Sequence, residues 1–309
     1  MQLNSVRASA ARRLGLAHAS AAARDARSEA TLDVLQAAIT QWGRPLTEDD
    51  LFAWHAALFP TGRSGISRIE AGAWRTHAEP MQIVTPRLGK PDVVHYQAPP
   101  SADVAAHMRL LLEWFNVVSA RQGIDGLVRA AVVHLWFETV HPFEDGNGRI
   151  GRALAELALA QDMRSNQRVF SLSAQLAQDR SGYYAQLQAA TGQPRPDITP
   201  WVQWFTGKIE AAFDAATSQM QTALARSRYW AKVNATHPDL SASQRKALAR
   251  LLEARPEGFA GGMSTEKYVN LTGASRATAY RDLTQLAEFG LVERTGQGRG
   301  TRYVLVEPA

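Results

Sequence analysis

A stretch of twelve residues carries side chains whose types and spacing could do chemistry. It runs from His141 to Arg152 and reads HPFEDGNGRIGR. An apolar run, Gly126–Val140, precedes the stretch, and an Ala/Leu-rich run, Ala153–Leu159, follows it. Both flanking runs are typical of buried helices. We therefore expect a loop that leads into the start of a helix.

A loop that leads into a helix start is suited to binding an anion. Gly146, Asn147 and Gly148 allow a tight turn and a close approach of the backbone to a ligand. The helix expected to begin near Gly148 presents unpaired N–H groups and the positive end of its dipole. Arg149 and Arg152 are three residues apart, so both guanidinium groups share one helical face and can bind phosphate oxygens.

His141 and Asp145 complete a set of groups for phosphate chemistry. Asp145 can hold Mg²⁺, which prefers one or two carboxylates together with phosphate oxygens. His141 has the only side chain in the stretch that is suited to taking up a proton near neutral pH. The combination indicates phosphoryl or nucleotidyl transfer. Single parts of it have plainer explanations, because Gly-Asn-Gly runs are often turns, helix arginines often face solvent, and a His-Pro pair often ends a helix.

The complete stretch resembles the signature of Fic-domain proteins, H-P-F-x-[D/E]-G-N-G-R-x-x-R, at every defined position. The resemblance covers roughly residues 1–236. It implies a mainly α fold, with a Fic helical core and a small β-hairpin flap. It also implies an enzyme, a nucleotidyltransferase that moves AMP from ATP to a Ser, Thr or Tyr hydroxyl of a target protein with Mg²⁺ bound. UMP, phosphate and phosphocholine stay open as the transferred group, because the pocket around the base cannot be read from the sequence.

The resemblance assigns roles to the motif residues. His141 is the general base that acts on the target hydroxyl, and Asp145 holds Mg²⁺ at the α- and β-phosphates. Phe143 is expected to be buried and to anchor the loop, whereas Glu144 occupies a variable position and receives no role.

The remaining motif positions are expected to bind the phosphates. The backbone of residues 146–148 holds phosphate oxygens, and Arg149 and Arg152 bind the β- and γ-phosphates. Two tyrosines further along the chain, Tyr183 and Tyr184, have two interpretations. They border an adenine pocket by stacking, or they are part of the core.

Two short β-rich runs around a Gly/Pro segment predict a hairpin ahead of the motif. The first run consists of Met81, Gln82, Ile83 and Val84, and the second is Val93–Tyr96. On its own this is a surface hairpin. Its distance before the motif resembles the flap of Fic proteins, which docks an extended stretch of the target by strand addition.

Composition limits the class of protein. The chain has 309 residues, which is enough for two domains, and its lack of cysteine excludes disulfides, thiol catalysis and Cys-ligated metals. It contains no apolar run long enough for a transmembrane helix, and its first residues lack the apolar core of a secretory signal. We therefore expect a cytoplasmic protein with no membrane part.

A second domain is expected after His237-Pro238. Helical patterns at Ser241–Leu252, Ser264–Leu271 and Arg276–Phe289 are followed by a hairpin pattern that ends at Val306. This order resembles a winged helix-turn-helix such as that of a subgroup of bacterial Fic proteins. The residues expected to face DNA are Ser275, Arg276, Thr278, Ala279 and Arg281, with Arg294, Arg299 and Arg302 in the wing.

The charge of this second domain is nearly balanced. Residues 238–309 carry ten Lys and Arg against eight Asp and Glu, a net charge of +2. That favours DNA binding only weakly, because many winged helices dock proteins instead. The domains expected are an N-terminal helical segment (1–44), the Fic core (45–205), a helical linker (206–237) and the winged helix-turn-helix (238–309).

Regulation is expected to involve Arg152. Many Fic proteins carry an inhibitory helix with the pattern [S/T]-x-x-x-E-[G/N], whose glutamate pairs with the second motif arginine. Glu210 and Glu288 come nearest to the pattern, but Ala211 and Phe289 follow them. Three explanations of the missing pattern stay open. The inhibitory helix lies upstream of this sequence, the protein is a naturally short form, or a separate partner supplies the inhibition.

A function of a different class is a DNA-binding transcription regulator whose Fic core is a nucleotide-responsive or sensory module. The intact base residue His141 argues against a core that only senses. A homodimer is a further expectation.

Overall fold

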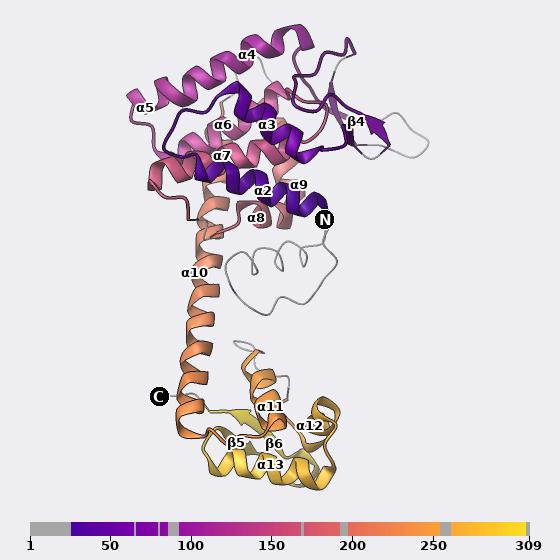
Figure 1. Cartoon of the computed structure of the whole chain (residues 1–309), viewed down its shortest axis with the longest axis vertical. Coiled ribbons are helices and arrows are strands. Elements are labelled where there is room, and N and C mark those ends of the chain that lie inside the picture. Colours follow the sequence, from indigo (N-terminus) through magenta and orange to yellow (C-terminus); the bar gives the residue numbers. More distant parts are fainter. Residues whose placement is uncertain are drawn as a thin grey trace. The chain divides into compact units, whose positions relative to one another are not determined.

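Figure 1 shows the computed structural model of the chain. It describes residues 26–64, 66–79, 81–85, 93–167, 170–191, 197–253 and 261–306, with the side chains of 26–28, 83–85, 93–95 and 299 excepted. The chain divides into two compact units, Met1–Thr217 and Ser218–Ala309. Helix α10, Thr199–Thr236, continues across this division.

The first unit is mainly helical, as predicted. Its helices before α10 are α2 (Ala26–Thr40), α3 (Glu48–Leu58), α4 (Ser101–Glu113), α5 (Ser119–Arg121), α6 (Gly126–Val140), α7 (Asn147–Met163), α8 (Leu172–Gln178) and α9 (Arg180–Thr191). A π-helical segment, Trp114–Val118, joins α4 to α5. Among the described residues, no helix is long and apolar enough to cross a membrane.

Helices α6 and α7 form the centre of the first unit. They pack against each other, and α7 also packs against α2. Helix α6 is buried on most sides, and Ala130, Val133 and Phe137 are fully buried. A helix that is apolar all round has to lie in the interior. The prediction of buried helices on both sides of the motif is therefore confirmed, and the motif lies in the loop between them.

Helix α3 is fixed at its start by local chemistry. The Thr47 hydroxyl accepts a hydrogen bond from the Asp50 backbone N–H, and the Asp50 carboxylate accepts from the Thr47 N–H. This reciprocal capping box satisfies two N–H groups that a helix start leaves unpaired. Arg44 pairs with the same carboxylate at 2.5 Å. The start of α3 is therefore well defined, and α3 supplies side chains that contact the motif loop.

Two short hairpins accompany the helices of the first unit. The predicted hairpin is present as β3 (Gln82–Thr85) and β4 (Val93–Gln97), which pair in antiparallel register with an irregularity between Ile83 and Val84. A second hairpin, β1 (Arg63–Ser64) and β2 (Ser67–Arg68), was not predicted. With two residues in each strand, it is too short to produce an alternating sequence pattern.

The second unit contains the predicted order of helices and hairpin. Its elements are α11 (Ala242–Glu253), α12 (Thr265–Thr272), α13 (Arg276–Glu288), β5 (Val292–Thr295) and β6 (Arg302–Leu305), with a 3₁₀ turn at Gly298–Gly300. Its core joins Tyr229 and Val233 of α10 to Leu248, Tyr268 and Leu283.

Helix α10 is longer than predicted. The sequence indicated a core that ends at residue 205 and a separate helical linker from residue 206, whereas one helix runs from Thr199 through Gly207 to Thr236 without a break. A single glycine costs a helix only about 1 kcal/mol relative to alanine, so good helix formers on both sides override it. The predicted boundary between residues 205 and 206 falls inside this helix.

Candidate functional site

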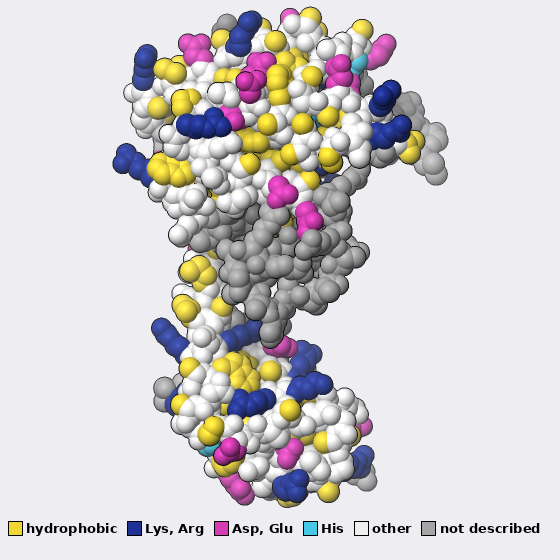
Figure 2. Space-filling view, in the orientation of Figure 1, with side chains coloured by type: hydrophobic (Ala, Val, Ile, Leu, Met, Phe, Trp, Pro, Cys, Tyr) yellow, Lys and Arg dark blue, Asp and Glu magenta, His cyan; other side chains and the backbone are white. Residues whose placement is uncertain are grey.

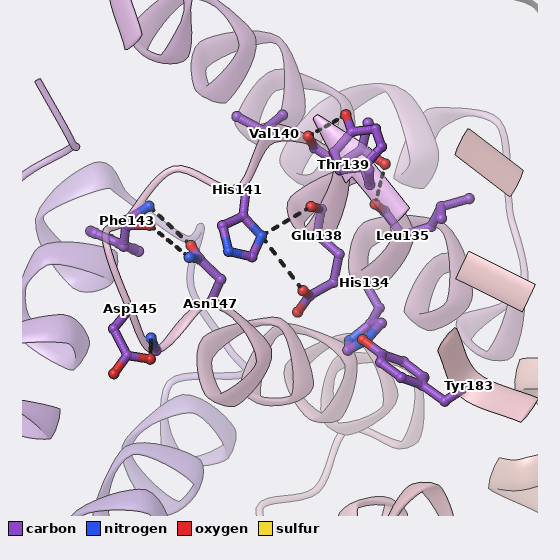
Figure 3. A network of polar contacts seen from close by, with 12 residues as sticks. His134, Leu135, Glu138, Thr139, Val140, His141, Phe143, Asp145, Asn147 and Tyr183 are labelled. Carbon is purple, nitrogen blue, oxygen red and sulfur yellow. Dashed lines mark hydrogen bonds and ion pairs between the residues drawn. The ribbon is translucent and has the colours of Figure 1, made fainter. Parts of the chain in front are cut away.

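His141 ends helix α6 in an unusual backbone conformation. Its φ and ψ are 48° and 58°, the left-handed region, while its N–H still donates to the Phe137 carbonyl. A residue with a side chain is uncommon there, because Cβ approaches the following carbonyl oxygen at a cost of roughly 1–2 kcal/mol. This turn at the end of α6 directs the chain into the motif loop (Figure 3).

Arg75 holds the backbone at this turn. The Arg75 side chain is 1% exposed, and its Nε donates to the His141 carbonyl at 2.8 Å. Its other nitrogens donate to the carbonyls of Val140 and Pro99 and to the Ser101 hydroxyl. Burial lowers the pKa of the guanidinium. Every acceptor is neutral, so Arg75 serves as a clamp for carbonyl groups.

Phe143 and Asn147 close the loop from inside. Phe143 is fully buried, as expected. The Phe143 N–H donates to Asn147 Oδ1 at 3.0 Å, and Asn147 Nδ2 donates back to the Phe143 carbonyl at 2.7 Å. The Asn147 side chain is therefore committed to the loop, so any contact with phosphate would come from its backbone.

Gly146 starts helix α7 in the left-handed region with φ of 86°. A Cβ there would lie 2.9 Å from Phe59 Cε2. Both the backbone conformation and the space beside α3 therefore require glycine. The helix begins at Asn147, one residue before the predicted start. Its N-terminal end lies at the motif, as a phosphate-binding loop needs.

The sequence analysis gave no functional role to His55 of α3, which contacts the motif loop. Its Nδ1 accepts a hydrogen bond from the Gly72 N–H at 2.9 Å, and its Nε2 lies 3.1 Å from the Asp145 carbonyl. A backbone N–H can only donate, so Nδ1 is the acceptor and Nε2 carries the proton. The ring also stacks on Phe143 at 4.0 Å. Burial lowers the pKa of His55 to about 4, so the neutral ring persists at neutral pH.

The Asp145 side chain is 46% exposed and is held by several donors. Ser64 of β1 donates its hydroxyl to Oδ2, the Gly146 N–H donates to Oδ1, and Arg149 Nη2 lies 3.6 Å from Oδ1. No group of three or more His, Asp or Glu side chains gathers as a metal cage in the described ranges. One exposed carboxylate beside a helix start still fits Mg²⁺, which takes few protein ligands and completes its shell with phosphate oxygens and water.

The two motif arginines differ in their surroundings. The Arg149 guanidinium lies over the Phe59 ring, 4.7 Å from its centre. Arg152 Nη1 lies 3.2 Å from where a Cβ on Gly148 would be, on the side that faces Glu138. Both guanidinium groups are partly exposed. They are therefore accessible to an anion at the start of α7.

Glu138 was missed by sequence reasoning. It is 4% exposed, and its Oε2 lies 4.0 Å from His141 Nδ1. Burial raises the pKa of Glu138 to about 7, and the positive charge of Arg152 opposes this rise. The signal was present in the sequence, since Glu138 stands three residues before His141 and such residues share a helical face. Burial also lowers the pKa of His141 to about 4, so its imidazole is neutral at neutral pH.

The two tyrosines have different environments. Tyr183 packs against the core, and its hydroxyl lies 3.0 Å from His134 Nε2. That contact fits the core interpretation of Tyr183. Tyr184 is 44% exposed and meets the edge of the Tyr183 ring. Its role beside an adenine stays a prediction.

The β3–β4 hairpin is tied to the end of α6. The Tyr96 hydroxyl donates to the Thr139 carbonyl at 2.7 Å, two residues before His141. The ladder extends to the Met81 carbonyl, which accepts from the Ala98 N–H, and Gln82 Nε2 donates to Gln97 Oε1. The side chains of Ile83 and Val84 lie outside the described residues. The structure therefore places the hairpin backbone, though not all of its predicted docking side chains, beside the motif.

The C-terminal residues expected at DNA lie mostly on the surface. Ser275, Arg276 and Arg281 are exposed, and the Ser275 hydroxyl caps α13 by accepting from the Thr278 N–H. The prediction for Ala279 is wrong, because this residue is fully buried in the core of the second unit. The side chain of Arg299 lies outside the described residues.

Comparison with known proteins matches one stretch of the first unit to a family. Residues 45–159 match the Fic/DOC family. The chain is 30% identical over 141 residues to protein adenylyltransferase fic-1 of Caenorhabditis briggsae, covering 46% of this chain and 25% of that protein. It is 33% identical over 119 residues to fic-1 of Caenorhabditis elegans, covering 38% and 22%. The chain thus spans about a quarter of the length of these relatives.

A solved structure shares the fold. The crystal structure of a Fic family protein from Desulfovibrio desulfuricans aligns with 99% of this chain and 86% of that chain, with a TM-score of 0.50 and 21% identity. At this identity the alignment shows the fold alone, and the Fic/DOC domain of this chain is the stretch of residues 45–159 that matches the family model.

Proposed function

We propose that this chain is a protein adenylyltransferase that transfers AMP from ATP, with Mg²⁺, to a hydroxyl side chain of a target protein. The observation that carries the proposal is the placement of a neutral, half-buried histidine at the end of α6, beside the start of α7 with its two arginines. Similarity to proteins named adenylyltransferases supports the same reaction.

The chemical step starts at His141. Its imidazole takes the proton from a Ser, Thr or Tyr hydroxyl as the hydroxyl oxygen forms a bond to the α-phosphorus. The bond between the α-phosphorus and the bridging oxygen breaks, and pyrophosphate leaves. Because burial keeps His141 neutral at pH 7, the base is ready without prior loss of a proton.

The start of α7 holds the polyphosphate in this proposal. Backbone N–H groups of residues 147 and 148 would face the phosphate oxygens, while the N–H of Gly146 donates to Asp145. Arg149 and Arg152 would bind the β- and γ-phosphates. Asp145, supported by Ser64, is the residue that would hold Mg²⁺. Mg²⁺, when bound, neutralises charge on the phosphates. Positioning and charge neutralisation supply most of the catalysis of such transfers.

The β3–β4 hairpin docks the target in this proposal. An extended stretch of the target would add to the strand formed by residues 82–85, with Met81, Gln82, Ile83 and Val84 beside it. The hydrogen bond from Tyr96 to the Thr139 carbonyl supports this placement, because it ties the hairpin to the turn that presents His141. The docked hydroxyl would then lie near the base.

Labelled nucleotide tests the function. The full chain is incubated with Mg²⁺, cell lysate and ATP labelled at either the α- or the γ-phosphate. We expect label on protein from α-labelled ATP alone, and its loss in His141→Ala with nucleotide binding retained. Transfer from γ-labelled ATP would identify a kinase instead, and equal labelling by His141→Ala would refute the role of the base. Parallel reactions with UTP and CDP-choline test the other transferred groups.

The second candidate function is DNA binding by a winged helix-turn-helix at residues 238–309, with the Fic core as a nucleotide-responsive module. It is favoured by the exposed, Ser-capped start of α13, which presents Arg276 and Arg281 to solvent. Against it, the face of this unit seen in Figure 2 carries Asp and Glu side chains as well as Lys and Arg. A gel-shift assay of the full chain at graded salt separates the two functions, because phosphate contacts make DNA binding strongly salt-dependent.

A further inference from the structure

A buried polar cluster lies behind His141, where α6 and α7 meet (Figure 3). It contains His134 and Glu138 of α6, Arg152 of α7 and Tyr183 of α9. His134 is fully buried and Glu138 is 4% exposed. The Glu138 Oε1 atom has no hydrogen-bond partner. A buried carboxyl oxygen without a partner in a native protein calls for an explanation, and function is one of the usual ones.

Two glycines of α7 make room for the Glu138 carboxyl group. A Cβ at Gly151 would lie 2.7 Å from Glu138 Oε1, closer than real Cβ atoms approach. A Cβ at Gly148 would lie 3.7 Å from the same oxygen and 3.2 Å from Arg152 Nη1. The Arg152 guanidinium therefore lies on the side of α7 that faces this carboxyl group. The close packing of α6 on α7 leaves the carboxyl group little freedom to move.

Glu138 supplies the acceptors that face one nitrogen of His141. The Glu138 backbone carbonyl lies 3.4 Å from His141 Nδ1, and its Oε2 lies 4.0 Å from the same atom. An imidazole that takes a proton at Nε2 must keep its Nδ1–H directed at an acceptor. It also gains from a nearby negative charge once it becomes an imidazolium, as an aspartate does for the base of a serine protease.

We propose that Glu138 is a positioning residue for the transfer reaction, with its carboxylate fixing the Nδ1–H tautomer of His141 and stabilising the imidazolium. This inference rests on the proposed function. Arg152 favours the ionised carboxylate by its positive charge, so one residue of α6 links the base to an arginine that binds phosphate in the proposed reaction. The proton taken from the target hydroxyl stays on Nε2, and Glu138 itself is not protonated in the step.

Two substitutions test the role in transfer by the full chain. Glu138→Gln keeps the shape and loses the charge, and Glu138→Ala removes the group. We expect kcat to fall roughly tenfold to a hundredfold in both, with KM for ATP changed less than about twofold, since the missing interaction acts mainly in the transition state. Glu144→Gln is the matched control, because it removes a carboxylate from the motif loop outside the cluster. Equal kcat for wild type and Glu138→Gln would overturn the proposal.

The pH profile separates positioning from a purely structural role. The titratable and charged groups that face Glu138 are His134 and His141 of α6, Arg152 of α7 and Tyr183 of α9. Burial lowers the pKa values of both histidines and raises that of Tyr183, so Glu138 is the group of this cluster that titrates near neutrality. We expect kcat of the wild type to rise between about pH 6 and 8 as Glu138 ionises, and this rise to be absent in Glu138→Gln. The same rise in both proteins would contradict the assignment.

A spectroscopic test is independent of the reaction. In protein labelled with ¹⁵N-histidine, the nitrogen shifts of His141 report which ring nitrogen carries the proton, and His141→Gln identifies the signals. We expect the Nδ1–H tautomer in the wild type at pH 8 and a larger share of the Nε2–H tautomer in Glu138→Ala, where the backbone carbonyl of residue 138 is the remaining acceptor for Nδ1–H. An unchanged tautomer in a folded Glu138→Ala protein would refute the positioning role. If the wild type transfers no AMP at all, the proposed function fails while this measurement still decides the inference about Glu138.

Discussion

Replacing His55 with phenylalanine tests how the motif loop is held. Phenylalanine keeps a ring that can stack on Phe143 and loses both hydrogen bonds of the imidazole. The Gly72 N–H then has no acceptor and the Asp145 carbonyl has no donor. These bonds join His55 to Gly72, which follows it by 17 positions, and to Asp145, which follows it by 90 positions. Their loss therefore detaches the motif loop from α3 and from the segment that contains Gly72.

The magnitude follows from the two groups left unpaired. A buried backbone group without a partner costs roughly 1–3 kcal/mol. Asp145 lies at the surface, so water can reach part of its carbonyl, and we place the total loss of stability at about 2–4 kcal/mol. Because the lost contacts hold the loop, we also expect slower AMP transfer.

Amide hydrogen exchange is the local assay. In the wild type the Gly72 amide should be protected, and in His55→Phe it should exchange faster by about 30-fold or more, the factor that 2 kcal/mol represents. Urea unfolding of the full chain gives the global value. His107→Phe is the control, because it places the same side chain on a half-buried position of α4. Equal protection of Gly72 in wild type and His55→Phe would refute the assigned bonds.

The pH dependence gives a second check with a defined sign. The pKa of His55 is about 4 in the folded chain against an ordinary value of 6.5, so the unfolded chain binds the extra proton first. The contribution of the neutral His55 ring to the free energy of unfolding is fully present above pH 6.5 and is lost as the pH is lowered towards 4. The loss is about 3 kcal/mol at most. This part of the acid destabilisation should be missing in His55→Phe. An identical acid profile in both proteins would contradict the low pKa.

Four further changes test neighbouring contacts. Arg75→Met should destabilise the chain by roughly 2–4 kcal/mol in urea, because it leaves the His141 and Val140 carbonyls without donors, and an unchanged midpoint would exclude the clamp. Gly146→Ala should cost about 1–2 kcal/mol from its left-handed backbone, plus the contact with Phe59, and should weaken ATP binding in calorimetry. Asp145→Asn should weaken Mg²⁺-dependent transfer, and activity without metal would contradict its role. The full chain should shift DNA weakly at physiological salt, and a tight, salt-sensitive complex would show that the balanced charge misled us.

The sequence alone determined the features that depend on neighbours along the chain. The motif loop between two buried helices and the order of helices and hairpin in the second unit were predicted and are present. Periodicity, capping and turn preferences act over a few residues, so a single sequence contains them. The Fic/DOC motif itself was also evident, because its residues are contiguous.

Only the tertiary structure decided which distant residues support the motif. Arg75 reaches the His141 carbonyl across 66 positions, and His55 reaches the Asp145 carbonyl across 90. No local pattern marks either residue, because a buried arginine or histidine reads in the sequence like one on a helix surface. Burial also sets their charge, since removing a group from water disfavours its ionised form by an amount that depends on every element packed around it. Glu138 combines a local and a tertiary feature. Its spacing of three residues from His141 is visible in the sequence, whereas its buried position against Gly148 and Gly151 follows from the packing of α6 on α7.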